Sequence, residues 1–388
     1  MKANPGGQIP PSEVVGRDKL IGELWRILER QSVVICSERR MGKTCVIKKM
    51  VAEAPEDKLA IYRDLEGVRA PLEFVDLVFH DVEGYLGSMK RLAERARRLL
   101  KQLSGAEFKG FKLPEYVASH WKDILTSTIE DFMEHQEKTV IFFWDEVPYM
   151  LHNIKRNNGE DTAMEILDVL RSLRHTYPNL RMVFTGSIGL HNVIRSLRRG
   201  GRPSDPTNDM YPIELPPLEF PDAEMLALQL LEGEEVRSDD MQEVARTIAQ
   251  AMDCIPYYIH HVVDQIKRQG GPVNAGTVEE IVVSCLVDPN DIWHLRHYYD
   301  RIENYYEPEE VPFTLGLLDV LATSEHPLKF DELFNLLKSQ EPTEDREMAR
   351  RVLGYLESDH YILRNPDGTY RFRFPLIQRW WKIYRGLT

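Results

Sequence analysis

The stretch that decides the fold spans residues 32–44 and reads SVVICSERRMGKT. Its first five residues form a short apolar run, which is typical of a strand buried in a parallel sheet. Residues 37–44 then match the pattern G-x-x-x-x-G-K-[ST] at every fixed position except the first, where Ser37 replaces glycine. A helical run over residues 46–51 follows. The order strand, loop, helix is the context that a phosphate-binding loop requires.

In a loop of this kind, backbone N–H groups surround phosphate oxygens, the lysine contacts the β and γ phosphates, and the hydroxyl binds Mg²⁺. Lys43 and Thr44 are the residues predicted for the last two roles. Serine tolerates positive φ less well than glycine, so we expect the first turn of the loop to differ in shape. The predicted nucleotide-binding residues of this segment are Ser37, Glu38, Arg39, Arg40, Met41, Gly42, Lys43, Thr44 and Cys45.

Further apolar runs cover residues 59–62, 139–144 and 181–185, with a weaker one at 211–215. Helical patterns lie between them, over residues 72–86, 90–103 and 163–173, and this alternation predicts a parallel α/β sheet. Residues 1–220 are therefore interpreted as one α/β domain. Residues 89–112, rich in lysine and arginine, are interpreted as an inserted helical element whose role the sequence does not reveal.

Polar residues follow two of these strands and so project from the carboxyl end of the sheet. Asp145 is predicted to hold Mg²⁺ and Glu146 to activate a water molecule, although an acidic pair can also simply end a strand. The hydroxyls of Thr185 and Ser187 are candidates to contact the γ-phosphate or the attacking water, with an ordinary polar turn as the alternative.

Two arginines, Arg198 and Arg199, close the helical stretch that follows. One interpretation is an arginine finger that reaches the nucleotide of a neighbouring subunit. The other is a solvated basic helix end. The sequence leaves both open.

The second half of the chain is helical over residues 221–306 and, after a charged linker, has three more helical patterns. Residues 361–364 and 369–374 alternate as strands around a Pro-Asp-Gly turn, which predicts a β-hairpin. From residue 346 to 385 there are nine Lys and Arg against four Asp and Glu. Duplex DNA is therefore a candidate partner, with phosphate contacts from Arg350, Arg351, Arg371 and Arg373.

The length, composition and net charge of the chain limit the classes of protein to which it can belong. The 388 residues suggest two or three domains, and 43% hydrophobic residues suffice for packed cores. The net charge of −13 argues against a protein that coats nucleic acid by bulk charge. No apolar run reaches the roughly 20 residues of a membrane span, and the amino terminus has no signal-peptide core. We expect a cytoplasmic protein without membrane contact.

Six segments together resemble the archaeal-type ATPases of the AAA+/STAND group of P-loop ATPases, and they extend over nearly the whole chain. They are residues 15–18, 37–44, 142–146, 185–187, 215–218 and 254–258. The resemblance implies a sheet with strand order 5-1-4-3-2, a helical lid over residues 221–306 and a winged helix over residues 307–388. It places Pro256 against the adenine and Gly16 and Arg17 near the base, while Cys254 replaces a glycine of the lid motif.

The resemblance further implies ATP or ADP with Mg²⁺ as ligands. The leading hypothesis is an ATP-binding, slowly hydrolysing switch in which nucleotide repositions the winged helix. Two alternatives are a DNA-binding regulator that uses nucleotide as a structural ligand, and an interaction scaffold that docks a protein partner. Self-association is a further implication of the family.

Two clusters of ring-bearing side chains, one of histidines and one of aromatic residues, are interpreted as structural elements and not as ligand-binding sites. The histidines at 260–261 and at 294 and 297 have no acidic or cysteine partners at metal-ligand spacing. Trp380 and Trp381, with Tyr384, are expected to pack rather than to stack on bases, because adjacent residues on a helix do not share a face.

Overall fold

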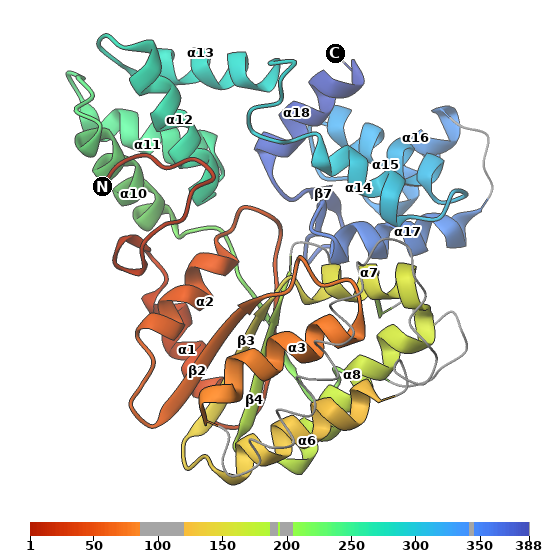
Figure 1. Ribbon diagram of the computed structural model, residues 1–388. Coiled ribbons are helices and arrows are strands. Elements are labelled where there is room, and N and C mark those ends of the chain that lie inside the picture. The colour runs from red at the N-terminus through yellow and green to blue at the C-terminus, as the bar shows by residue number, and fades with distance from the viewer. Residues whose placement is uncertain (86–119, 187–192, 195–204, 341–344, 388) are drawn as a thin grey trace. The chain divides into compact units, whose positions relative to one another are not determined.

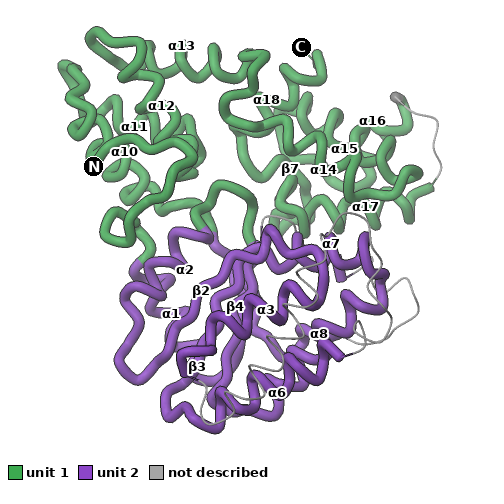
Figure 2. Tube along the Cα trace, in the orientation of Figure 1, with its two compact units in different colours: residues 1–17, 37–42, 216–388 green, residues 18–36, 43–215 purple. Residues whose placement is uncertain are grey.

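The computed structural model describes residues 1–85, 120–186, 193–194, 205–340 and 345–387 (Figure 1). The basic segment 89–112, Ser187, Arg198 and Arg199 lie outside the described residues. The chain divides into two compact units, one of residues 18–36 and 43–215 and the other of residues 1–17, 37–42 and 216–388 (Figure 2). The predicted boundary near residue 220 thus lies close to a boundary of the structure, but two amino-terminal segments group with the carboxy-terminal residues.

The first unit is built on a five-stranded parallel sheet of order β2-β3-β4-β1-β5, which is the predicted order 5-1-4-3-2 written from the opposite edge. The predicted fold class is confirmed. The strands are β1 (Val33–Cys36), β2 (Lys58–Asp64), β3 (Thr139–Asp145), β4 (Leu180–Thr185) and β5 (Tyr211–Glu214). The helices are α1 (Asp18–Leu28), α2 (Lys43–Ala52), α3 (Pro71–Val82), α6 (Trp121–Glu134), α7 (Val147–Asn158) and α8 (Glu160–Thr176), with a 3-10 turn η2 (Glu83–Tyr85).

Strand β3 shows why helices cover both faces of this sheet. Its side chains alternate between the faces and are all buried from Val140 to Asp145. Phe142 and Trp144 point to one face, where they meet Phe132 of α6 and Phe74 of α3, while Phe143 meets Trp25 of α1 on the other. A strand that is apolar on both faces therefore becomes the centre of a three-layer α/β unit.

The second unit begins with the 3-10 turn η1 (Pro11–Glu13) and contains two groups of helices, in green to blue in Figure 1. The first group, within the predicted lid, consists of α10 (Phe220–Gly233), α11 (Met241–Ala251), α12 (Pro256–Gln269) and α13 (Ala275–Leu286). Helix α10 packs on α11 and α12, and α13 packs on α11 and α12.

The second group starts with α14 (His297–Tyr305) and continues with α15 (Val311–Thr323), α16 (Phe330–Gln340) and α17 (Arg346–Ser358). The predicted hairpin follows as antiparallel β6 (Ile362–Arg364) and β7 (Tyr370–Phe372), and α18 (Pro375–Arg385) ends the unit. Helix α15 is the hub of this group, because α16, α17, α18 and β7 all pack on it.

A buried carboxylate fixes α18 to this hub. Asp319 of α15 accepts hydrogen bonds from Trp381 Nε1 at 2.8 Å and from Arg385 Nη2 at 2.7 Å. Trp380 and Trp381 are 4% and 0% exposed, so the prediction that they serve packing is confirmed. Among the described helices, none combines the length and the apolarity needed to cross a membrane.

Candidate functional site

The loop between β1 and α2 has a backbone suited to wrapping an anion. Arg40 and Gly42 have φ of 73° and 88°, in the left-handed region, and α2 begins directly afterwards at Lys43. Ser37 is not among the residues with positive φ. The first position of the motif therefore does not adopt the conformation that favours glycine, and the expected difference in the shape of the first turn stays a prediction.

In the first unit, two predicted residues converge on the carboxylate of a third, Asp145. The Oγ1 atom of Thr44 donates to Asp145 Oδ2 at 2.6 Å, and the hydroxyl of Thr185 donates to Asp145 Oδ1. Asp145 is 3% exposed and Thr185 2% exposed. A buried carboxylate beside a threonine hydroxyl is the oxygen donor set that Mg²⁺ takes in nucleotide sites, so Thr44 and Asp145 fit the predicted metal role.

The hydroxyl of Thr185 is engaged with Asp145 in the structure, and its contact with the γ-phosphate or the attacking water stays a prediction. The residue after it, Gly186, has a steric reason to be glycine: a Cβ atom there would lie 2.4 Å from Cδ of Pro148. The turn at the end of β4 therefore packs against the start of α7. Ser187, the other predicted hydroxyl, lies outside the described residues.

Glu146 occupies the N-cap of α7 with φ of 57°. Its backbone N–H donates to Asp145 Oδ1 at 3.1 Å, which fixes the turn, while its side chain is half-buried. A left-handed residue other than glycine is uncommon and is found often at functional sites. The geometry thus places the predicted base immediately beside the predicted metal ligand.

Two residues at the end of β2 join this site and escaped the sequence analysis. Asp64 is the register partner of Asp145, and Tyr62 lies two residues earlier on the same strand. Burial raises the pKa of Tyr62, and the charges of Asp145, Asp64 and Glu146 raise it further, so its phenol stays protonated. The signal was present, because Asp64 also follows an apolar run at the carboxyl end of a strand.

In the second unit, Arg17 links the segments that the resemblance assigns to the base. It is 4% exposed, and its guanidinium donates to the carbonyls of Pro216 at 2.9 Å and Met41 at 3.0 Å. The preceding Gly16 has φ of 67°, and a Cβ atom there would lie 2.7 Å from Cβ of Asp222. Arg17 therefore holds the loop segment 37–42 to the start of the helical group, and its predicted place near the base stays a prediction.

The predicted adenine motif has a strained backbone. Asp253 and Cys254 have φ of 49° and 57°, and α12 begins two residues further on, at Pro256. The carbonyl of Cys254 accepts from the N–H of Leu218 at 3.0 Å, which joins the motif to the segment that Arg17 holds. Cys254 thus adopts a conformation that glycine, the residue it replaces, would take without strain.

Arg40 of the loop stacks on α12, with its guanidinium carbon 3.9 Å from the centroid of the Tyr257 ring. Cation–π contacts of this kind stabilise by about 0.5–2 kcal/mol. Burial lowers the pKa of the neighbouring His261 to about 4, and of His260 likewise, so both imidazoles are neutral at pH 7. Nδ1 of His260 accepts from the N–H of Asn4 at 3.1 Å.

Asp253 also caps α18, since its Oδ2 accepts from the N–H of Leu376 at 2.8 Å. Burial raises its pKa from 3.8 to about 7, against smaller lowering effects of that N–H, Arg379 and Arg371. A carboxyl group whose pKa is higher in the folded than in the unfolded protein contributes fully to the stability of the fold at pH values below its ordinary pKa. This contribution to the free energy of unfolding is lost as the pH rises through about 7.

We therefore expect Asp253→Asn to match the wild type in unfolding free energy near pH 4 and to exceed it by roughly 2–4 kcal/mol at pH 8. Urea unfolding of both proteins across this pH range measures the difference in unfolding free energy. Because both proteins contain the buried histidines, the difference reports on Asp253 alone. The exposed Asp239→Asn serves as control. A difference that does not change with pH would contradict the expectation.

The predicted DNA contacts are engaged with neighbouring groups. Arg351 lies 3.5 Å from the buried Glu310, and Arg350 forms an ion pair with Glu347 while lying 4.7 Å from the ring centroid of Phe330. On the hairpin, Arg371 donates to the carbonyl of Phe372 at 3.2 Å, and Arg373 lies 3.3 Å from Nδ1 of His360. The side chains of Arg350 and Arg351 are both about half exposed, at 50% and 49%.

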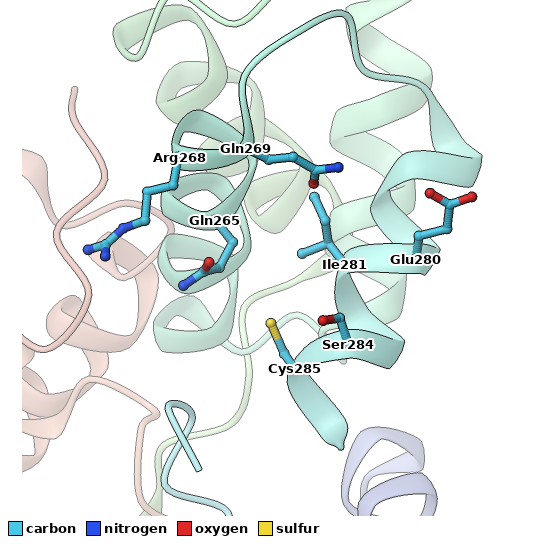
Figure 3. Close-up of a pocket in the computed structure, with 7 residues that line it drawn as sticks. All are labelled: Gln265, Arg268, Gln269, Glu280, Ile281, Ser284 and Cys285. Atoms are coloured by element: carbon cyan, nitrogen blue, oxygen red, sulfur yellow. The ribbon is translucent and has the colours of Figure 1, made fainter. Parts of the chain in front are cut away.

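A pocket of about 430 Å³ between α12 and α13 is lined by none of the predicted site residues. Its lining includes Gln265, Arg268 and Gln269 of α12 and Ile281, Ser284 and Cys285 of α13; Figure 3 shows Gln269 extending toward Ile281, whereas Arg268 points away from α13. Arg268 pairs with Asp264 at 2.8 Å. Burial raises the pKa of Cys285 to about 11, so its thiol is not a reactive thiolate at neutral pH.

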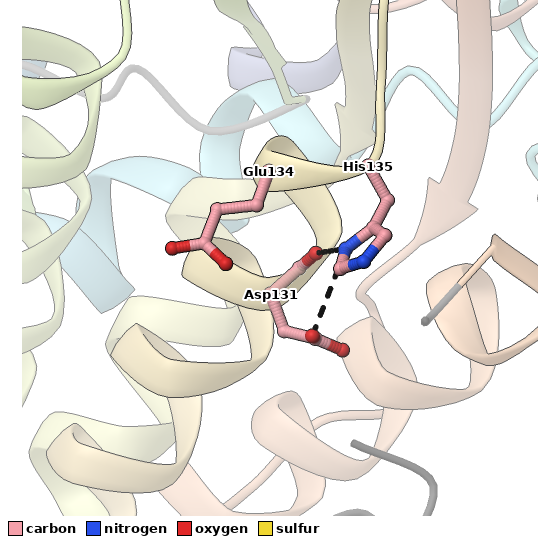
Figure 4. A group of neighbouring side chains, drawn as sticks. All are labelled: Asp131, Glu134 and His135. Carbon is pink, nitrogen blue, oxygen red and sulfur yellow. Dashed lines mark hydrogen bonds and ion pairs between the residues drawn. The ribbon is translucent and has the colours of Figure 1, made fainter. Parts of the chain in front are cut away.

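Asp131, Glu134 and His135 gather at the carboxyl end of α6 (Figure 4). Nδ1 of His135 lies 2.8 Å from the backbone carbonyl of Asp131 and 3.7 Å from its carboxylate. Glu134 and His135 are exposed. The imidazole thus caps the helix end from which it extends, and the group is explained by that local interaction.

The fold has known counterparts. The Walker-type ATPase PABY2304 of Pyrococcus abyssi superposes with a TM-score of 0.67 at 14% identity, over 99% of this chain and 100% of that one. The ORC2 protein of Aeropyrum pernix, in its ADPNP–ADP complexes, gives 0.57 at 13% identity, over 98% and 96%. No protein-family model matches the sequence, and neither does any curated protein. The chain therefore shares its fold with these two proteins along nearly its whole length, one of which is a Walker-type ATPase.

Proposed function

We propose that this protein is an ATP-binding, slowly hydrolysing molecular switch of the AAA+/STAND type. The observation that carries the proposal is the 2.6 Å hydrogen bond between Thr44 and Asp145, because it joins the last residue of the phosphate-loop motif to the acid that ends β3. The motif of residues 37–44 is contiguous in sequence, and α2 begins inside it at Lys43. A helix N-terminus adds favourable electrostatics for phosphate.

In this proposal, Lys43 stabilises the β and γ phosphates and Thr44 and Asp145 hold Mg²⁺. The ion supplies charge neutralisation for the phosphates when it is bound. Thr185 orients Asp145 through its hydroxyl, and Glu146 accepts a proton from the attacking water. We assign the base to residues 16–17, Arg40 and Pro256. The reason is that hydrogen bonds and a stacking contact join the segments that contain these residues in the second unit.

The test is a titration with labelled ATP and ADP in the presence and absence of Mg²⁺. Saturable binding that Mg²⁺ strengthens for ATP supports the proposal. A protein that binds neither nucleotide at millimolar concentration would overturn it.

We further propose that residues 307–388 form a winged helix that engages DNA or a protein partner. The support is its three helices followed by the β6–β7 hairpin, together with the half-exposed Arg350. Duplex binding that weakens with salt, and that Arg350→Glu with Arg371→Glu reduces, identifies DNA as the partner. Absent or salt-insensitive binding favours a protein partner and the scaffold alternative.

A further inference from the structure

Glu38 is an unusual residue for a phosphate loop, because its negative charge repels the ligand that such a loop is proposed to bind. It is 2% exposed, and its Oε1 accepts from the N–H of Arg39 at 2.7 Å. Burial alone would raise the pKa of Glu38, but the charge of Arg301 and the hydrogen bond from that N–H hold it below its ordinary value. The carboxyl group is therefore ionised, and a buried ion requires a partner.

The partner is Arg301 of α14, which is itself only 9% exposed. Its Nη1 lies 2.8 Å from Glu38 Oε1. Burial lowers the pKa of the adjacent His297 to about 3, so this imidazole carries no charge at neutral pH. The guanidinium of Arg301 is thus the cation that compensates Glu38.

The same guanidinium has a second carboxylate partner. Nη2 of Arg301 lies 3.5 Å from both the carbonyl and Oδ1 of Asp359, the 1% exposed residue that ends α17. The hydroxyl of Tyr306 donates to the other oxygen of Asp359 at 2.7 Å. The centroid of the ring of Tyr361, two residues after Asp359, lies 5.3 Å from the guanidinium carbon of Arg301. Arg301 is therefore shared between the phosphate loop and the carboxy-terminal helices.

We propose that Arg301 is a regulatory counter-ion, which makes the phosphate loop able to accept a polyphosphate and is withdrawn when the end of α17 moves. This rests on the proposed function for the identity of the ligand. The charge of Glu38 repels phosphate when it is uncompensated, and at short range in a protein such a repulsion is substantial. A partner that moves Asp359 and draws Arg301 away with it leaves Glu38 uncompensated and lowers nucleotide affinity, and nucleotide opposes that movement to the same extent.

The test compares ATP and ADP dissociation constants of the full-length wild type with four variants. Arg301→Gln is expected to weaken binding about tenfold or more, and Glu38→Gln in the same chain to restore it. Asp359→Asn is expected to tighten binding, because Arg301 then pairs with Glu38 alone. Arg296→Gln, an exposed arginine at the start of the same helix, is the matched control and should have no effect.

Arg301→Gln leaves two buried carboxylates without their cation and is the variant most exposed to misfolding. Asp359→Asn therefore carries the test independently: unchanged affinity in that variant overturns the proposal, as does an Arg301→Gln effect that Glu38→Gln does not restore. A wild type that binds no nucleotide overturns the proposed function instead. In that case a double-mutant cycle on urea unfolding still measures the coupling of Glu38 and Arg301.

Discussion

Replacement of Lys43 by alanine is expected to abolish measurable binding of ATP and ADP. Lys43 is the first residue of α2 and is 7% exposed. Its side chain is therefore largely shielded from solvent. Charge-assisted hydrogen bonds to phosphate are among the strongest polar contacts, and losing them in a buried site costs about a hundredfold in affinity or more.

The matched control is Lys49→Ala on the same helix, because Lys49 is engaged in an ion pair with the exposed Asp18 at 3.1 Å. Its nucleotide affinity should equal that of the wild type. Urea unfolding shows whether Lys43→Ala keeps its fold. A folded variant with unchanged affinity would remove Lys43 from the site.

Replacement of Glu146 by glutamine is expected to remove ATP turnover while leaving nucleotide affinity close to that of the wild type. General-base catalysis typically contributes about 10²–10⁴-fold, and the amide cannot accept the proton. The half-buried Glu146 has its backbone fixed by the hydrogen bond from its N–H to Asp145, so the isosteric change should preserve the turn. Steady-state phosphate release over a series of protein concentrations measures the effect.

Glu160→Gln is the control, since Glu160 pairs with Lys155 at 2.7 Å at the start of α8. Equal background rates in wild type and Glu146→Gln would favour the alternative in which nucleotide is a structural ligand. Specific activity that rises with protein concentration would indicate a site completed between subunits, the role considered for Arg198 and Arg199.

Local sequence patterns predicted the sheet because a buried parallel strand is recognisable from its apolar run alone. The run at 139–144 corresponds to β3 (Thr139–Asp145), and the polar residues after it lie where the argument from strand ends places them. The strand order came from the resemblance, not from periodicity. Asp64 was missed although the same argument applies to it, because the apolar run before it, at 59–62, is shorter than the run at 139–144 before Asp145.

The long-range contacts were not predictable from the sequence. Glu38 and Arg301 are 263 positions apart, and nothing in either neighbourhood indicates the other. The same holds for Asp253, which caps α18 across 123 positions, and for Arg17, whose partner carbonyls carry no side-chain signature. Buried ion pairs depend on tertiary packing, so the sequence assigned a solvent or ligand role to groups that the fold engages internally.

Residues 37–42 belong to the unit that contains residues 216–388, and this has a consequence for how the chain can be divided or recombined. A fragment that ends near residue 215 keeps every strand of the sheet but loses the partners of Arg17, Glu38 and Arg40. Exchange of the carboxy-terminal half with that of another ATPase would likewise leave Glu38 opposite an unmatched residue. The two halves of this chain are therefore not interchangeable modules, and a chimera would need to carry residues 16–17 and 37–42 together with its new carboxy-terminal half.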